Sequence, residues 1–222
     1  MAIRPVFVAD IGTKGFVKEV PVSFTWYAGF SVAQKQRSIV SLQENFQHFY
    51  KDSKVLEISS KSTERVGNSL SAFNMMIYNG EFGKNYTVEC AFQGSKVFER
   101  GGPYKDLLDD SSLEAKRDTR LKTSGRLITF DYGGYKWPLD PKTAFYDWLY
   151  MSSLYKKNAL KEEVLSYDAF TDIEFNPDKS INCQARSAAL FVSLHESGRL
   201  DEAMHDVKGY VNVLVSINND KI

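Results

Sequence analysis

The stretch from Asn85 to Arg100 constrains the fold more than any other part of the chain. Thr87 is a good helix N-cap, because its hydroxyl can accept hydrogen bonds from the free amides of the first turn. Residues 101–103 (Gly-Gly-Pro) predict that this helix ends after Arg100. With about 100° between successive side chains, four polar residues fall within an arc of about 60°. They are Glu89, Gln93, Lys96 and Arg100.

The other faces of this helix are apolar, so the sequence predicts a largely buried helix with a narrow polar stripe. Buried charged groups need either a partner or a chemical task. An ion pair between Glu89 and Lys96 would hold two elements in register and would account for the stripe. A catalytic site on the same face would account for it equally well.

The stretch also resembles the signature of the NADAR (YbiA-like) family, which runs Tyr-Pro-Thr-x-Glu-His-Ala-Phe-Gln-Ala-x-Lys-Phe. The residues that fit are Tyr86, Thr87, Glu89, Ala91, Phe92, Gln93, Lys96 and Phe98. Cys90 replaces the usual histidine and Gly94 the usual alanine, and an extra residue precedes Phe98. Residues 70–73 (Leu-Ser-Ala-Phe) and 112–117 (Ser-Leu-Glu-Ala-Lys-Arg) resemble two further family motifs. A weaker match follows at residues 181–185, and the resemblance covers residues 55–198.

NADAR relatives are N-glycosidases, and the resemblance implies that Lys96 is the lysine that forms a Schiff base with a ribose. The chemistry of the residue types agrees with this role. A lysine among apolar neighbours has a lowered pKa, so a fraction is neutral and nucleophilic. A nearby carboxylate, here Glu89, opposes that shift of the pKa but can act as general acid or base.

The variant sequence is similar to the NADAR antitoxins that accompany DarT-type DNA ADP-ribosyltransferase toxins. The matching segments are Glu-Cys-Ala-Phe-Gln-Gly-Ser-Lys in the helix, the Gly-Gly-Pro-Tyr after it, and residues 143–148 and 168–172. This resemblance implies removal of ADP-ribose from guanine in DNA. The implied partners are ADP-ribosylated DNA, the product ADP-ribose and a toxin encoded alongside.

Two other functions remain open from the sequence. One is an N-glycosidase that acts on a small ribosylated metabolite, such as an aminopyrimidine ribotide of the riboflavin pathway. The other is a non-catalytic module that binds ADP-ribose or the toxin. In a module that only binds the toxin, Lys96 would be dispensable for neutralisation.

Several other side chains are candidates for substrate binding. Residues 130–137 predict an aromatic, glycine-rich loop whose rings either stack on a base or ribose or fold onto the core. Cations in the next helix either contact phosphate or form a solvated face. Either Asp172 or Glu174 is expected to line the same cleft as Glu89, Gln93 and Lys96. The candidates are Gln93, Lys116, Arg117, Tyr132, Trp137, Asp172, Glu174 and Asn182.

Composition and motifs argue against other classes of function. The three histidines lie far apart and the chain has neither His-Glu-x-x-His nor Cys-x-x-Cys, so we expect no metal site. Neither Gly-x-Gly-x-x-Gly nor a Walker loop is present, so we expect no cofactor. The two cysteines lie in apolar contexts and no run of eighteen apolar residues occurs, which predicts a cytoplasmic protein without a membrane span.

The pattern of short β-branched runs between longer amphipathic helices predicts a single α+β domain, mostly helical, of YbiA-like type. A small sheet is expected from strands at residues 4–9 and 16–22 and from segments near Val55 and Ile173. Residues 1–54 are expected to form an extension of strand hairpin and helix that packs on a catalytic domain of residues 55–222. A capping box at Ser111 and Glu114 and a turn at Asn79-Gly80 are further predictions.

Overall fold

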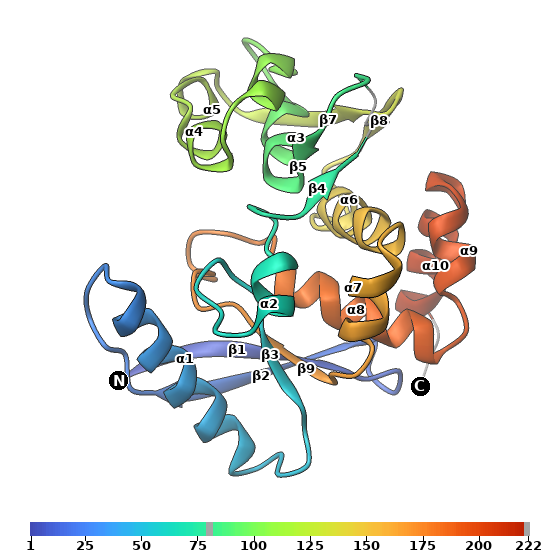
Figure 1. Ribbon diagram of the computed structural model, residues 1–222. Helices are drawn as coiled ribbons and strands as arrows, with labels where there is room; N and C mark the ends of the chain where they lie inside the picture. Colours follow the sequence, from blue (N-terminus) through green and yellow to red (C-terminus); the bar gives the residue numbers. More distant parts are fainter. Residues whose placement is uncertain (79–81, 220–222) are drawn as a thin grey trace.

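Four short strands form the main sheet, in the lower part of the molecule in Figure 1, in the order β2-β1-β9-β3. β1 (Ala2–Ala9) and β2 (Val17–Phe24) form an antiparallel hairpin. β9 (Ala169–Thr171) pairs antiparallel with β1 and parallel with β3 (Val55–Glu57). The computed structural model describes residues 1–78 and 82–219. The strands predicted at the N-terminus and near Val55 and Ile173 therefore do share one sheet.

Alternation along the strands gives this sheet two apolar faces. Val6 packs with Leu42 and Phe46 of α1 (Val32–Gln47), which covers one face. Phe7, the next residue, belongs to the large core on the other face, where α8 (Gln184–Glu196) packs. Figure 1 shows α1 and α8 on opposite sides of the sheet. The N-terminal residues thus supply an inner strand of the sheet and the cover of one of its faces.

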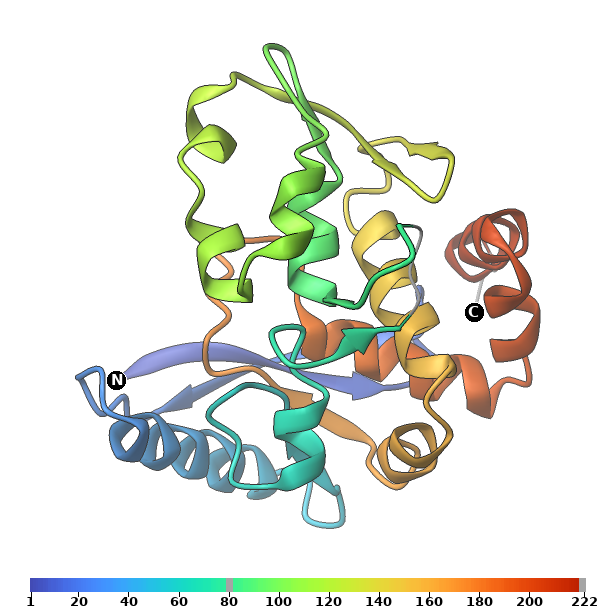
Figure 2. The same ribbon diagram turned by 45° about the horizontal axis from the view of Figure 1, so that its top comes forward.

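A second layer lies on the α8 side, in the upper part of Figure 1. It holds α3 (Val88–Gly94) and a three-stranded antiparallel sheet of β6 (Lys96–Phe98), β7 (Leu127–Tyr132) and β8 (Tyr135–Trp137). Residues 105–117, drawn in light green in Figure 2, lie beside α3 in this layer. The other elements are β4 (Met76–Ile77), β5 (Tyr86–Thr87), η1 (Lys105–Asp109), α2 (Arg65–Ser69), α4 (Ser112–Arg117), α5 (Arg120–Thr123), α6 (Ala144–Tyr155), α7 (Asn158–Val164), α9 (Leu200–His205) and α10 (Val207–Asn219).

Two local predictions were wrong. The helix predicted to reach Arg100 ends at Gly94, because the following residues pair with β7 as strand β6. Val97 and Phe98 are β-branched and aromatic, types that favour a strand once a partner strand is available. The loop predicted at residues 130–137 is instead the end of β7, a turn at Gly133-Gly134 and β8. The predicted capping box of Ser111 and Glu114 is confirmed, and the predicted turn at Asn79-Gly80 lies outside the described residues.

A buried ion pair joins α6 to α8 at the centre of the molecule. The Arg186 guanidinium donates to Asp147 Oδ2 at 2.6 Å, and the Ser187 hydroxyl donates to Asp147 Oδ1 at 2.6 Å. Asp147 is 1 % exposed, so its charge needs both partners. This network fixes α8 against α6 and so positions the loop that carries residues 172–183.

The packing of α1 on the sheet predicts that two phenylalanines three residues apart differ in their effect on stability. Phe46 is fully buried and stacks on Tyr50 with 4.4 Å between ring centroids, whereas Phe49 is 87 % exposed. We expect Phe46→Ala to lower the free energy of unfolding by about 3–5 kcal/mol. Phe49→Ala should change it by less than about 0.5 kcal/mol. Urea denaturation measures both values, and equal effects would contradict the packing of α1 described above.

Candidate active site

Lys96 lies two residues beyond the end of α3, yet its amine still reaches the polar face of that helix. Thr87 caps the helix start as predicted, with its Oγ1 accepting from the Cys90 amide at 3.2 Å. At the other end, Ser95 keeps right-handed helical backbone angles before the chain enters β6. The Lys96 Nζ therefore lies 2.7 Å from Gln93 Oε1, as it would in a continuous helix. Arg100 does not lie on this polar face, because the helix has ended, and its guanidinium donates to the carbonyl of Thr123.

A chain of polar contacts links four side chains around α3. The Lys96 amine donates to Gln93 Oε1, and Gln93 Nε2 donates to Glu89 Oε1 at 2.8 Å. The Lys116 amine, from α4, lies 3.7 Å from the same Glu89 oxygen. Glu89 and Gln93 are 5 % and 6 % exposed, while the Lys116 side chain is largely exposed. The chain therefore leads from a partly exposed lysine through buried groups to a cation at the surface.

The environment of Lys96 lowers its pKa to about 8. The main cause is the removal of the amine from water, because a charge is less stable in a poorly solvated place. The amine lies 4.6 Å from the centre of the Phe92 ring, which forms part of this apolar surrounding. The negative charge of Glu89 raises the pKa, and the positive charge of Lys116 lowers it. At pH 7 about one amine in ten is then neutral.

A second group of polar side chains comes from the β9 side of the molecule. Gln184 Nε2 donates to Asp172 Oδ2 at 3.0 Å and to the carbonyl of Ile58 at 2.7 Å. The peptide of Ala72 joins this group to α3, because its N–H donates to Gln184 Oε1 and its carbonyl accepts from the amide of Glu89. Residues 70–73, which resemble a NADAR motif, thus connect the two halves of the site.

Asp172 and Glu57 form a pair of buried carboxyl groups. Burial raises the pKa of both carboxyl groups, and the nearby charge of Glu57 raises the pKa of Asp172 further. Glu57 accepts from the Thr171 hydroxyl and the Ile173 amide. The charge of Lys116 lowers the pKa of Asp172, which places Asp172 within electrostatic reach of the Lys96 site. Two close carboxyl groups do not both ionise readily, so this pair retains a proton at neutral pH.

The family model of the DarT1-associated NADAR antitoxins matches residues 2–221. The chain belongs to this family. No curated protein matches the chain significantly. The family match includes the N-terminal hairpin and α1, which lie outside the motifs that first suggested the resemblance.

The other residues predicted for the candidate site differ in their exposure and contacts. Glu174 is exposed and pairs with Lys35 at 3.2 Å, so Asp172 is the acid that faces the buried groups. Arg117 is exposed at the end of α4. Tyr132 is partly buried, with 3.1 Å between its hydroxyl and that of Tyr86. Asn182 is partly exposed, but its Oδ1 is buried without a protein partner among the described residues.

Trp137 is a core residue in this structure. It is 2 % exposed, and its ring lies against Phe145, Trp148 and Tyr210, at 5.0–6.3 Å between centroids. Trp137 was a candidate for substrate binding because residues 130–137 were predicted to form a loop. The β7–β8 pairing instead fixes it in the core, opposite Phe130.

Sequence reasoning missed three residues of the site. Glu57 and Gln184 are separated from α3 in the sequence, and only the pairing of β3 with β9 brings Glu57 beside Asp172. Tyr146 is a buried residue of α6. Its pKa is raised by burial and then by the charges of Glu89 and Asp172, so it lies near both carboxyl groups. No spacing in the sequence signals these contacts.

Gly102 holds the loop after β6 against the Lys96 backbone. Its φ is +88°, and a Cβ at this position would lie 2.2 Å from the carbonyl oxygen of Lys96. Both facts require glycine. The Gly-Gly-Pro-Tyr segment, predicted to lie near the end of the stripe, therefore packs directly on the strand that carries Lys96.

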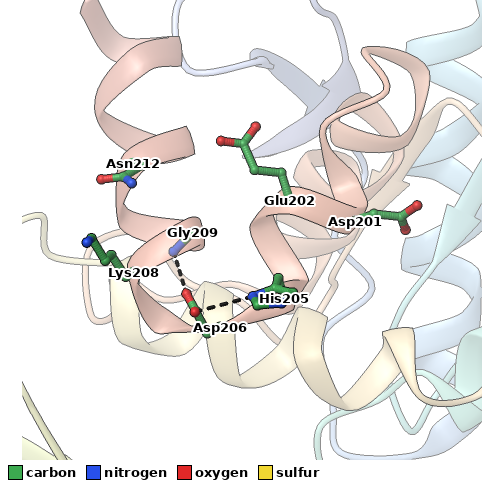
Figure 3. Close-up of a pocket in the computed structure, with 7 residues that line it drawn as sticks. All are labelled: Asp201, Glu202, His205, Asp206, Lys208, Gly209 and Asn212. Atoms are coloured by element: carbon green, nitrogen blue, oxygen red, sulfur yellow. Dashed lines mark hydrogen bonds and ion pairs between the residues drawn. The ribbon is translucent and has the colours of Figure 1, made fainter.

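A shallow hollow elsewhere on the surface has no part in this site. Figure 3 shows it between α9 and α10, where Asp206 accepts hydrogen bonds at the start of α10 from the Gly209 amide and lies beside His205. These contacts are typical of a helix N-cap. The lining residues are Asp201, Glu202, His205, Asp206, Lys208, Gly209 and Asn212.

Within residues 1–78 and 82–219, histidine, cysteine and acidic side chains form no group of three or more that could hold a metal ion. No helix in the same ranges is both long and apolar enough to cross a bilayer.

The opposing charges around Lys96 predict opposite shifts of its pKa in two variants. Glu89→Gln removes an attractive negative charge and should lower the pKa below about 8. Lys116→Gln removes a repelling positive charge and should raise it. NMR titration of the lysine side chain, assigned with Lys96→Arg, measures these shifts. Lys122→Gln, an exposed position on α5, is the control and should leave the pKa unchanged. A wild-type pKa near 10.5 would contradict the desolvation of the amine.

Proposed function

We propose that this protein is an N-glycosidase that removes ADP-ribose from guanine in DNA and thereby reverses the action of a DarT1-type toxin. The observation that carries the proposal is the Lys96 amine, whose pKa is lowered to about 8 and which is linked through Gln93 to Glu89. A partly neutral amine beside a carboxyl group is the pair that imine chemistry at a sugar carbon requires. Membership of an antitoxin family supports the same reaction.

The reaction begins with the neutral Lys96 amine. Its lone pair forms a bond to C1 of the ribose, and the bond from C1 to the guanine nitrogen breaks. Guanine leaves with the bonding electrons and takes up a proton. The amine on C1 loses a proton and the sugar ring opens, with the ring oxygen protonated, to give an imine. Water then adds to the imine carbon, and closure of the sugar releases ADP-ribose and the neutral amine. The net change is hydrolysis with one water molecule.

Glu89 relays the protons of this sequence. It accepts a hydrogen bond from Gln93 on its own helix and forms an ion pair with Lys116 on α4, so contacts with two elements hold it in place. Asp172 and Glu57 retain a proton between them, which makes Asp172 a hydrogen-bond donor to a ribose hydroxyl at neutral pH. Lys116 and Arg117, both exposed on α4, provide positive charge for the diphosphate of ADP-ribose.

Substitution of Lys96 is the most direct test. Lys96→Ala should abolish release of ADP-ribose from a guanine-ADP-ribosylated oligonucleotide, because it removes the amine that contacts Gln93. The Lys116 amine near Glu89 is largely exposed and cannot replace the poorly solvated, partly neutral Lys96 amine. Lys96→Arg should also fail, since guanidinium stays protonated. Borohydride added during turnover should trap a covalent adduct on Lys96, seen by mass spectrometry.

Near-normal turnover by Lys96→Ala, or turnover without a trapped adduct, would replace the imine with direct attack by water. Neutralisation of the toxin by an inactive Lys96→Ala protein would favour a binding module instead. Cleavage of a ribosylated metabolite but not of the oligonucleotide would show instead that the protein is an N-glycosidase that acts on a small metabolite.

Glu89→Gln should keep the shape of the site and lower kcat by about 10²–10⁴-fold, which is the usual contribution of general acid–base catalysis. Its residual activity should also have a different pH profile. In the wild-type enzyme, kcat/KM should rise with pH up to about 8 as Lys96 becomes neutral, and then level off. Glu89→Gln should move that inflection to lower pH, because the Lys96 pKa falls. A pH series of initial rates measures both effects, and an unchanged rate and inflection would exclude Glu89 from the mechanism.

A further inference from the structure

We propose that the segment Trp26–Arg37, the loop before α1 and its first turns, binds single-stranded DNA next to the modified base. This inference rests on the proposed function and specifies where the DNA strand runs. The segment presents aromatic rings together with cations on one surface. Phe30 is completely exposed, and Trp26 and Tyr27 are partly exposed. The Lys35 amine lies 4.6 Å from the centre of the Trp26 ring.

The cations around these rings have few acidic neighbours. The Arg4 guanidinium lies 5.8 Å from the Trp26 ring centre, and that of Arg37 lies 4.0 Å from the Tyr27 ring centre. Among residues 1–78 and 82–219, no carboxylate lies within ion-pair distance of Arg4 or Arg37. Residues 25–37 contain no Asp or Glu. The protein as a whole has no net charge, so attraction to phosphate depends on local patches such as this one.

A series of contacts leads from this segment to the candidate active site. The Lys35 amine pairs with Glu174, and the Glu174 amide donates to Asp172 Oδ1 at 3.0 Å. Asp172 is in turn within electrostatic reach of Lys116, which pairs with Glu89. Figures 1 and 2 show the loop before α1 and the segment after β9 on the same side of the molecule as α4. A strand that enters the Lys96 site therefore has a direct path over the N-terminal surface.

The chemistry of the surface favours an unpaired nucleic acid strand. Exposed rings stack on bases only when the bases are unpaired, and stacking of this kind tolerates any base. Arginine and lysine beside the rings match the phosphates of the same strand. The Lys35–Glu174 pair neutralises one cation, so Arg37 and Arg4 are left as the phosphate contacts. Contacts with the neighbouring part of the strand also leave the modified base free to turn into the site.

Binding of an unmodified single-stranded oligonucleotide tests this surface independently of catalysis. Phe30→Ala combined with Arg37→Gln should weaken binding by at least about tenfold in fluorescence anisotropy, because one stacking ring and one phosphate contact are lost. The slope of log affinity against log salt concentration should also become shallower, by the amount that corresponds to about one phosphate contact. Phe49→Ala combined with Lys51→Gln, exposed at the other end of α1, is the matched control and should bind like wild type.

A second readout separates this inference from the proposed function. On ADP-ribosylated oligonucleotide, the Phe30/Arg37 variant should show a raised KM, while cleavage of ADP-ribosylated guanosine should be unchanged. Equal binding and equal KM in this variant and its control would overturn the inference. Intact DNA binding with loss of toxin neutralisation would also overturn it and would assign the surface to a protein partner. Failure of the wild-type protein to cleave any substrate would reject the proposed function, while the anisotropy result still decides whether the segment binds DNA.

Discussion

The Gln93 side chain separates Lys96 from Glu89 in the candidate site through the polarity of its amide. A lysine amine only donates hydrogen bonds and an ionised carboxylate only accepts them. Gln93 must therefore turn its oxygen to Lys96 and its nitrogen to Glu89, at 2.7 and 2.8 Å. As a spacer it prevents a direct ion pair between the lysine and the glutamate. A direct pair would hold the amine in its charged form, whereas the spacer leaves desolvation as the larger influence on its pKa.

This arrangement depends on parts of the chain that are far apart in the sequence. The Ala72 peptide accepts from the Glu89 amide and donates to Gln184, so it fixes the start of α3 relative to α8. Gln184 holds Asp172, which follows the β9 strand of the main sheet. β9 lies between β1 and β3, and α1 covers the outer face of that sheet. The N-terminal residues thus stabilise β9, the strand that precedes Asp172, and their removal would change the position of Asp172.

The sequence predicted the features that local chemistry determines. The Thr87 cap and the spacing of Glu89, Gln93 and Lys96 follow from helix geometry over a few residues, and the four strands of the main sheet follow from short β-branched runs. Pairing between distant segments determines the rest. The strand β6 ends α3 before Lys96 because β7 is available to pair with it, and β8 draws Trp137 into the core. Glu57 and Asp172 meet only because β3 pairs with β9, and neither residue has a local signal for this contact.

The groups proposed for catalysis also oppose folding at neutral pH. Lys96 has a folded pKa of about 8 against an ordinary 10.5, so below pH 8 the folded state loses on the order of 3 kcal/mol, and the loss is relieved as the pH rises from 8 to 10.5. Asp172 has a raised pKa, so the pH dependence of its contribution has the opposite sign: stability falls as the pH rises from the unfolded pKa of this carboxyl group towards its folded pKa. At neutral pH neither group is at its most favourable, and the surrounding core must supply the difference. Perturbed lysine and carboxyl groups that persist together in this way are more typical of a reactive site than of a structural ion pair, which would have brought the lysine and the glutamate into direct contact.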